Sequence, residues 1–486
     1  MPILMWLFTI PFIASIVILA FPSLSGKFTK RFAFLLSLIP LAILIYNHAN
    51  LVGMEANYAW ISPLSIEFFL KIDALSLVFL YLTAVIIPIS ILAVDCSKLT
   101  QPNIYYFFVL LLQGLLIGFF MARDLALFTI FWESMLLPLY FIINIWGGEH
   151  RQNAALKFLI YMIAGSALMI AAVLFLYFAA AAAGTGTFNM DLLQKIAPTA
   201  PYVGFAFAVF MLAFAVKTPL FPFHAWLPDA YYQAPTSGTI LLSAILSKAG
   251  IYGILRIGME LFPQLLKEWS PLLLGLAIFG VFYGGLAAWM QKDIKRLIAY
   301  SSFSHVNFIL AGLFVWHEPA QAGAILQSIN HGITIAGLFL VAGWLENILK
   351  STSMNHVSGL AKYLPNLCWL TLIFVLASVA LPGTNNFIGE LMILFGLFGQ
   401  NPYIAAVLGL SIILSAIYML RFMQKVYFGL SSPHQPNWSD IGIKELLIAA
   451  PLITLILWLG IYPAPVLDEI KPAIEKIVTL AQGNPS

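Results

Sequence analysis

Charged residues are scarce in this sequence. Asp, Glu, Lys and Arg together make up 9% of the 486 residues, whereas hydrophobic residues make up 62%. Soluble globular domains carry about 25% charged residues, so the composition excludes a soluble protein and indicates an integral membrane protein. The net charge is only +3 and no long basic run occurs, which gives no indication of nucleic-acid binding.

Cysteines and nucleotide-binding motifs are also missing. The two cysteines, Cys96 and Cys368, are far apart and form no CxxC motif, which excludes a disulfide framework, a thiolate metal site and iron–sulfur ligation. Neither GxGxxG nor GxxxxGK[ST] occurs, so the chain has no visible means of holding a nucleotide. Whatever powers this chain is therefore expected elsewhere.

Long apolar stretches are abundant. A stretch of about 18 or more apolar residues is long enough to cross a bilayer as a helix. About fourteen such spans are predicted, near residues 3–21, 32–47, 74–94, 104–121, 125–145, 155–180, 203–222, 239–260, 271–290, 294–315, 321–346, 367–397, 402–428 and 445–463. The first lacks a basic n-region, which favours a membrane helix over a cleaved signal peptide. The expected fold class is an all-α polytopic membrane protein.

Two segments outside the spans have recognisable patterns. SIEFFLKI, at 65–72, alternates in part and is rich in β-prone residues, so it predicts a hairpin outside the cytoplasm. After the last span, PVLDEIKPAIEKIVTL places Ile470, Ile474 and Ile477 at helical spacing between charges, together with Val466 and Val478. This pattern predicts an amphipathic helix at the surface.

Basic residues are distributed unequally between the two sides of the membrane. Fourteen of the 23 Lys and Arg residues fall in the odd-numbered connections and seven on the other side. Because basic residues concentrate in cytoplasmic loops, both termini are expected on the non-cytoplasmic side.

Two of the predicted spans are interrupted by proline and polar residues. They contain AVKTPLFPFHAWLP and ASVALPGTNNFIGELM. Irregular backbone at membrane depth is tolerated where it is buried or lines a cavity, and paired interruptions are typical of transporters built from inverted repeats. The predicted organisation is three N-terminal helices in residues 1–100, a five-helix repeat in 101–262, an inverted repeat in 263–430, and a last helix with its tail in 431–486.

Titratable side chains inside the spans are the main candidates for function. They are Glu133, Lys217, Lys248, His305, His331 and Glu390. Placing a charged side chain at membrane depth costs about 2.5–3.5 kcal/mol on insertion scales, which favours a functional position facing protein or water. Each also has a structural interpretation: Glu133 could pair with Lys217, and each histidine could bond a helix carbonyl. His224 is expected at the interface.

Taken together, the six residues favour a function. Acids, amines and imidazoles spread over six predicted helices are what a proton relay requires, whereas a structural ion pair needs only two groups. A carboxylate beside a buried ammonium stabilises its charge, so opening or closing a Glu133–Lys217 pair is a plausible switch. Metal binding is not indicated, because neither histidine has a second ligand three or four residues away.

Three segments resemble the antiporter-like membrane subunits of respiratory complex I. They are FWESMLLPLYFIINIWGGEHRQNAALKFLIYMIAGSALM, AVKTPLFPFHAWLPDAYYQAPTSGTILLSAILSKAGIYGILR and SSFSHVNF. The resemblance covers nearly the whole chain after about Leu70 and implies proton translocation. It also implies that Glu133 and Lys217 form a switchable pair, and that Lys248 and His305 link two half-channels. By the same resemblance His331 lies on or beside the axis, and Glu390 passes the proton outwards.

Glu390 also favours one branch of that family. Most members carry Lys at this position, whereas the M-type (chain M, subunit 4) carries Glu, and Asn307 stands where many relatives have Gly. The resemblance implies a bacterial inner membrane, neighbouring L and N chains, and NADH, FMN, iron–sulfur clusters and quinone held in other subunits. The alternatives are a subunit of a secondary Na⁺/H⁺ antiporter, the equivalent subunit of a ferredoxin-fed photosynthetic or hydrogenase-type complex, and a purely structural spacer.

Overall fold

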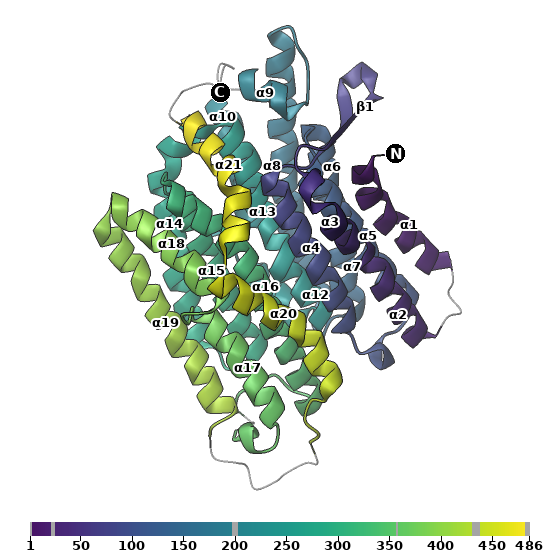
Figure 1. Cartoon of the computed structure of the whole chain (residues 1–486), viewed down its shortest axis with the longest axis vertical. Helices are drawn as coiled ribbons and strands as arrows, with labels where there is room; N and C mark the ends of the chain where they lie inside the picture. Colours follow the sequence, from purple (N-terminus) through teal and green to yellow (C-terminus); the bar gives the residue numbers. More distant parts are fainter. Residues whose placement is uncertain (1, 21–24, 197–202, 356–357, 430–437, 482–486) are drawn as a thin grey trace.

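A computed structural model describes residues 2–20, 25–196, 203–355, 358–429 and 438–481. Its helices run roughly side by side, and both chain ends lie at the same end of the bundle as strand β1 and helix α21 (Figure 1). Phe21, the expected end of the first span, and the boundary expected at 430–431 fall outside the described residues. The all-α polytopic fold predicted from the sequence is confirmed.

The N-terminal part contains four helices and a hairpin. Its elements are α1 (Ile3–Ala20), α2 (Gly26–Ser37), α3 (Ile39–Leu51), β1 (Glu55–Ile61), β2 (Ile66–Lys71) and α4 (Ala74–Leu92). The second expected span is longer than predicted and is divided into α2 and α3. It begins earlier because the Ser25 side chain caps α2 by accepting a hydrogen bond from the Phe28 amide.

The predicted hairpin is present. Strands β1 and β2 pair antiparallel, with Glu55 opposite Lys71 and Tyr58 opposite Phe68. A bridge between Leu70 and Ala122 ties the hairpin to the end of the helix that follows α4. The hairpin therefore lies against the end of the bundle that also holds the chain termini (Figure 1).

The middle of the chain forms helices of very different lengths. They are α5 (Pro102–Met121), α6 (Leu125–Ser134), α7 (Leu136–Trp146), α8 (Arg151–Ala182), α9 (Met190–Ile196), α10 (Val203–Lys217), α11 (Leu227–Gln233), α12 (Thr236–Leu241) and α13 (Ser247–Gly253). Two π-helical turns, Leu242–Leu246 and Ile254–Met259, flank α13 and join it with α12 into one continuous buried span.

The remaining helices are α14 (Pro263–Met290), α15 (Ile294–Leu313), α16 (Glu318–Leu349), α17 (Pro365–Ser378), α18 (Asn385–Gln400), α19 (Pro402–Val426), α20 (Ile443–Ile461) and α21 (Ala464–Ala481). The predicted C-terminal amphipathic helix is α21, whose Ile470, Ile474 and Ile477 are buried against the bundle. Apolar side chains at this spacing anchor the helix along one face while its charges remain in solvent.

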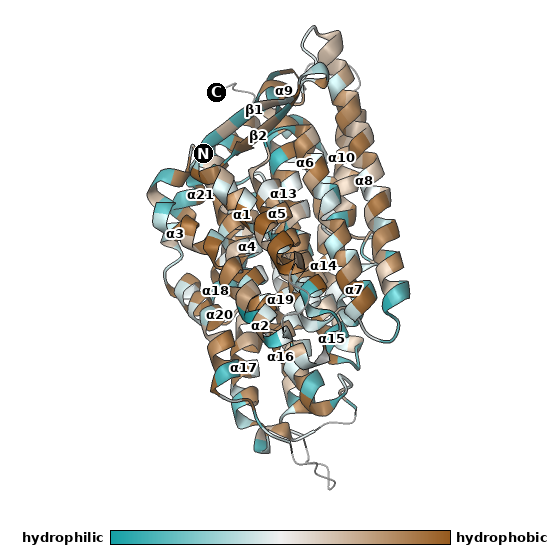
Figure 2. Cartoon of the chain, turned by 90° about the vertical axis from the view of Figure 1, so that its right-hand side faces the viewer, coloured by the Kyte–Doolittle hydropathy of each residue, from teal (hydrophilic) through white to brown (hydrophobic). Residues whose placement is uncertain are grey.

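Eleven helices of the described residues are long and apolar enough to cross a membrane. Helices α10 and α17 are apolar but shorter, because both stop at an interruption. Hydrophilic residues gather at the hairpin and near the helix ends, while the long helices are mostly hydrophobic (Figure 2). At the centre, α16 packs against α4, α12, α15, α18 and α20, so that almost every residue from Ala320 to Leu345 is buried.

Candidate functional site

The first interrupted span ends its first half at Lys217. Helix α10 stops there because Pro219 and Pro222 each lack an amide hydrogen, and the chain resumes as a helix only at Leu227. A side-chain hydrogen bond, which is not part of the helical backbone pattern, holds the chain at this break. Trp226 Nε1 donates to the Val216 carbonyl at 2.9 Å. The predicted interruption is therefore present, and it places Lys217 at a helix end in the interior.

Lys217 is bound by Trp132 on α6. Its side chain is 1% exposed, its Nζ donates to the Trp132 carbonyl at 3.1 Å, and it lies 3.7 Å from the centre of the Trp132 ring. Both contacts stabilise a buried cation. The neighbouring Glu133 is half-buried, and within the described part of the chain its Oε1 has no hydrogen-bonding partner.

The Glu133–Lys217 pair is adjacent but open. No ion pair within 4.0 Å joins these two residues, which differs from the closed pair expected as one state of the switch. Lys217 instead contacts the carbonyl oxygen and the aromatic ring of Trp132, the residue directly before Glu133. The structure thus brings the two residues together without closing the contact.

The π-helical turns on both sides of α13 position Lys248. A π-turn leaves carbonyls outside the normal helical ladder, and such turns are frequent at functional sites. Lys248 Nζ donates to the Ser243 carbonyl at 2.7 Å and to Ser247 Oγ at 3.3 Å. Its third contact is His331 Nδ1, at 2.7 Å, and the lysine side chain is completely buried.

The row continues from His331 to Glu390. The rings of His331 and His305 lie with centroids 5.8 Å apart, and His305 Nδ1 lies 3.2 Å from Glu390 Oε1. Gln327 Nε2 donates to the same carboxylate oxygen at 3.2 Å. Four of the six predicted residues therefore form one buried row, Lys248–His331–His305–Glu390, which crosses from α13 through α16 and α15 to α18.

The second interrupted span is held from α16. Helix α17 ends at Ser378 and α18 begins at Asn385, as the second proline-containing motif predicted. Asn330 Nδ2 donates to the Asn385 carbonyl at 2.7 Å, and Asn385 Nδ2 donates back to the Asn330 carbonyl at 3.0 Å. Because Asn330 precedes His331, the histidine of the row and the support of this break share one turn of α16.

An asparagine on α15 supports the first break in a similar way. Asn307 Nδ2 donates to the Pro219 carbonyl at 3.3 Å and to the Phe303 carbonyl at 2.9 Å. Its side chain packs where Gly280 leaves room, since a Cβ there would come within 2.3 Å of Asn307 Oδ1. Asn307 lies two residues after His305, so each histidine-bearing helix also holds one of the interrupted spans.

Lys217 and Lys248 are connected by packing and have no direct hydrogen bond in the described structure. Gly250 on α13 packs against Thr218, and a Cβ at Gly250 would lie 2.0 Å from Thr218 Oγ1. The break after Lys217 therefore lies directly against the helix that carries Lys248. This close approach requires a glycine.

A second group of buried charges was not predicted. Arg256 forms ion pairs with Asp73 and, at 2.7 Å, with Glu260; Arg123 pairs with Asp191 at 2.6 Å and with Glu260 at 3.3 Å. Burial would raise the pKa of Asp73, but the Arg256 and Arg123 guanidinium groups outweigh it and hold the pKa well below its ordinary value. The pKa of Glu260 is lowered for the same reason.

Arg256 was counted with the seven basic residues on the non-cytoplasmic side, and the structure buries it: it is 2% exposed within the π-helical turn that ends its span. The available signal was its spacing, since Glu260 follows four residues later on the same helical face. His224, which was expected at the interface, is buried against Phe221 and Phe303.

Metal ligands do not cluster in the described residues. No three His, Cys, Asp or Glu side chains gather there as a metal site would require. The groups that do come together are an ammonium, two imidazoles and a carboxylate, all of which can accept and release protons.

Residues 122–416 match the family model described as "NADH:quinone oxidoreductase/Mrp antiporter, TM". The chain is 36% identical to NADH-quinone oxidoreductase subunit M of Escherichia coli K12, over 98% of this chain and 97% of that protein. It is 38% identical to the protein of the same name from Pseudomonas aeruginosa, over 96% and 95% of the two chains.

Solved structures agree with these relatives. A chain of respiratory complex I from Thermus thermophilus, solved with bound NADH, superposes with a TM-score of 0.89 at 29% identity and covers 99% of this chain and 100% of that one. The Mrp complex of Dietzia sp. shares the fold, with a TM-score of 0.87 at 21% identity over 99% and 98% of the two chains. The chain therefore belongs to the NADH:quinone oxidoreductase/Mrp antiporter membrane family, and within it to the antiporter-like M subunits of respiratory complex I.

Proposed function

We propose that the buried row Lys248–His331–His305–Glu390 carries protons through this membrane-arm subunit. The observation that supports this is the continuity of the row: a 2.7 Å contact, two facing imidazoles and a 3.2 Å contact connect four titratable side chains that are all nearly inaccessible to solvent. A structural ion pair needs two groups, and this row places four in succession across four helices.

Glu133 and Lys217 act as the switch that loads the row. In the open arrangement Lys217 rests on Trp132, and Glu133 keeps a carboxylate oxygen free of partners among the described residues. Closing the pair stabilises the ammonium of Lys217, whereas opening it favours release of a proton towards Lys248. Thr218 and Gly250 form the contact through which the two lysine-bearing spans meet.

The proton then passes along the row towards Glu390 and leaves on the outer side. Lys248 releases its proton to His331, and His305 delivers one to Glu390. Each imidazole can take a proton on one nitrogen and release it from the other. Gln327 donates to Glu390 Oε1 and stabilises the carboxylate after it has lost its proton.

Redox chemistry elsewhere in the complex supplies the energy. Moving one elementary charge against 100 mV requires about 2.3 kcal/mol, which proton carriers alone cannot generate. NADH, FMN, the iron–sulfur clusters and quinone are assigned to other subunits. The neighbouring antiporter-like chains L and N are the partners through which the switch at Glu133 and Lys217 is coupled to that chemistry.

Both termini and the hairpin are assigned to the non-cytoplasmic side. The unequal distribution of Lys and Arg supports this orientation. The equivalent placement of the two breaks supports an inverted pair of five-helix repeats, residues 101–262 and 263–430. In this arrangement each repeat contributes one interrupted span and part of the row.

Redox-driven pumping in membrane vesicles that contain Lys217→Ala tests the proposal. We expect the complex to assemble while proton uptake and NADH:quinone electron transfer fall together. The matched control is Lys157→Ala, which removes a partly exposed lysine paired with Asp229 at 2.7 Å. Normal pumping by the Lys217 variant would contradict the proposal. Sodium-dependent proton exchange without NADH oxidation would instead support a secondary antiporter.

A further inference from the structure

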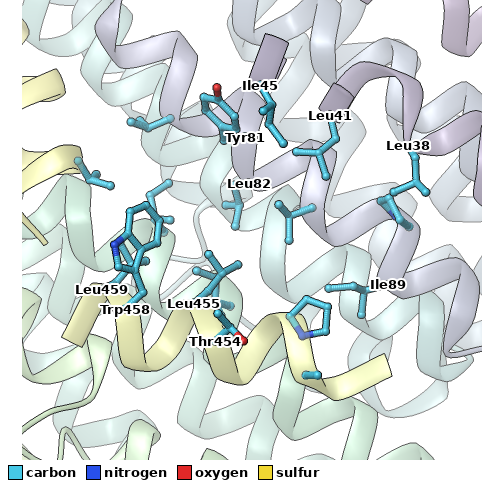
Figure 3. Close-up of a pocket in the computed structure, with 18 of the residues that line it drawn as sticks. Leu38, Leu41, Ile45, Tyr81, Leu82, Ile89, Thr454, Leu455, Trp458 and Leu459 are labelled. Carbon is cyan, nitrogen blue, oxygen red and sulfur yellow. The ribbon is translucent and has the colours of Figure 1, made fainter. Parts of the chain in front are cut away.

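An apolar groove of about 1,000 Å³ lies between α2, α3, α4, α16, α20 and α21. Figure 3 shows side chains from these helices pointing into it, among them Leu41, Leu82 and Leu455. This volume is at the upper end of the range of about 300–1,000 Å³ found for ligand pockets. No step of the proposed proton path uses the groove.

The groove opens to the surface of the chain. Three of its lining residues are strongly exposed: Ile45 is 63% exposed, Leu447 65% and Trp458 44%. Between Leu447 and Leu459 it follows α20 for about 18 Å, at about 1.5 Å per residue. Half of a hydrocarbon core about 30 Å thick is about 15 Å, so the groove is about as long as one leaflet is deep.

Basic residues lie at one end of the groove. Lys30 Nζ donates to the carbonyls of Leu92, which lines the groove, and Val94, at 2.8 and 2.6 Å. Lys444 is exposed one turn before Leu447 and lies close enough to Lys30 to interact electrostatically. Among the described residues Lys444 forms no ion pair within 4.0 Å.

The acidic residues at this end already serve as helix caps. Glu445 accepts a hydrogen bond from the Gly442 amide at 3.0 Å, and Asp95 accepts from the Ser97 amide at 3.1 Å. Both carboxylates keep their negative charges. Lys27 and Arg31 lie beside Lys30 on α2, so with Lys444 four basic side chains stand against two acidic ones at this end. Basic pockets between membrane helices on the cytoplasmic side favour anionic lipid headgroups.

We propose that this groove binds an anionic phospholipid, with its acyl chains between α4 and α20 and its phosphate at Lys444 and Lys30. A neighbouring transmembrane helix fits less well. A helix offers no phosphate to the lysines, whereas acyl chains fill a narrow space and carry the headgroup to one end.

The lipid would also insulate the proton row, an additional role that rests on the proposed function. Ile329 and Ile333 line the groove on α16 and flank His331, which faces Lys248. Gly332 packs against Leu82 of α4 at the floor of the groove. Acyl chains on this face keep water away from the back of the helix that carries His331.

Photolabelling of the purified, reconstituted complex tests the site. The probes are phosphatidylglycerol and phosphatidylethanolamine, each with a diazirine in one acyl chain, and labelled residues are mapped by peptide mass spectrometry. We expect phosphatidylglycerol to label the segments 77–92 and 447–459 at least several-fold more than phosphatidylethanolamine does. Equal labelling by the two lipids would overturn the anionic headgroup assignment.

Two variants with matched controls separate the acyl and headgroup contacts. Thr454→Trp fills the groove and should reduce labelling by both probes, whereas Leu457→Trp, outside the groove on the same helix, should not. Lys444→Gln should reduce phosphatidylglycerol labelling alone, and Lys425→Gln should leave it unchanged. Unchanged labelling in Thr454→Trp, or a crosslink from this face to a neighbouring subunit in place of lipid, would overturn the site. Proton pumping, measured on the same samples, reports separately on the proposed function.

Discussion

Lys248 Nζ lies 2.7 Å from His331 Nδ1, and both side chains are buried. An ammonium has only protons to donate, so a charged Lys248 requires Nδ1 to accept and places the proton of a neutral His331 on Nε2. Neither His331 Nε2 nor His305 Nε2 has a hydrogen-bonding partner among the described residues. Transfer between the two rings, 5.8 Å apart, therefore needs a bridging water or a ring movement.

His331→Ala should interrupt this row. We expect redox-driven pumping to fall at least about tenfold in an assembled complex, because a positioned proton carrier contributes about 10²- to 10⁴-fold to proton transfer. The control is His224→Phe, which replaces another buried histidine inside an aromatic cluster beside Phe221 and Phe303. Proton uptake per NADH oxidised measures the effect, and equal loss in both variants would assign the defect to packing.

Asn307→Ala should loosen the first interrupted span. Removing the donor leaves the Pro219 carbonyl unsatisfied in the interior, which costs about 1–3 kcal/mol. Amide hydrogen exchange in residues 218–226 should therefore accelerate by about five- to a hundred-fold. Asn153→Ala, at an exposed position of α8, should leave that exchange unchanged. Unaltered exchange in the Asn307 variant would show that the break is held by other contacts.

The sequence predicted the spans, the hairpin, the amphipathic tail and both interruptions, because each has a local signal. Pro219 and Pro222 mark one break within a few residues, and Ile470, Ile474 and Ile477 mark one helical face. These features depend on periodicity and backbone chemistry, which are properties of short segments. The structure has the hairpin, the tail and both interruptions where the patterns indicated, but eleven helices of the described residues are long and apolar enough to span, against about fourteen predicted.

Contacts between distant segments were harder to predict from the sequence. The resemblance put His331 only on or beside the axis, whereas the structure places it between Lys248 and His305. Periodicity places a residue inside a span but does not say which neighbour it meets. The hydrogen bond from Asn307 to Pro219 joins residues 88 positions apart, and the resemblance marked Asn307 only as a departure from Gly.

Arg256→Met should destabilise the end of the bundle that holds the hairpin. Removing one partner leaves the buried Glu260 and the partly buried Asp73 with less compensation, at a cost of about 3–5 kcal/mol. The yield and thermal unfolding of the assembled complex measure this cost. Arg151→Met, which removes an exposed arginine, should have little effect. A complex as stable as the parent would show that the cluster does not hold this end together.

The cluster around Arg256 should also make the thermal stability of the complex depend on pH. The folded-state pKa values of Asp73, Glu260 and Asp191 are lowered. Their contribution to the free energy of unfolding is therefore present at pH values above their unfolded-state pKa values of about 3.9–4.3. The contribution is lost as the pH falls through the folded-state values. The difference in unfolding temperature between parent and Arg256→Met should stay constant from about pH 7 to 5 and shrink below about pH 4. A difference that grew on acidification would contradict this assignment.

The most direct test of the account is pumping by Lys248→Arg. Arginine keeps the positive charge beside His331 but cannot be deprotonated in a protein, so a charge that only stabilises the fold is retained while a proton carrier is lost. Lys157→Arg, in the partly exposed pair with Asp229, is the control. We predict an assembled Lys248→Arg complex that no longer translocates protons when NADH is oxidised. Normal proton translocation by that complex would show that Lys248 is a structural charge and would contradict the proposed row.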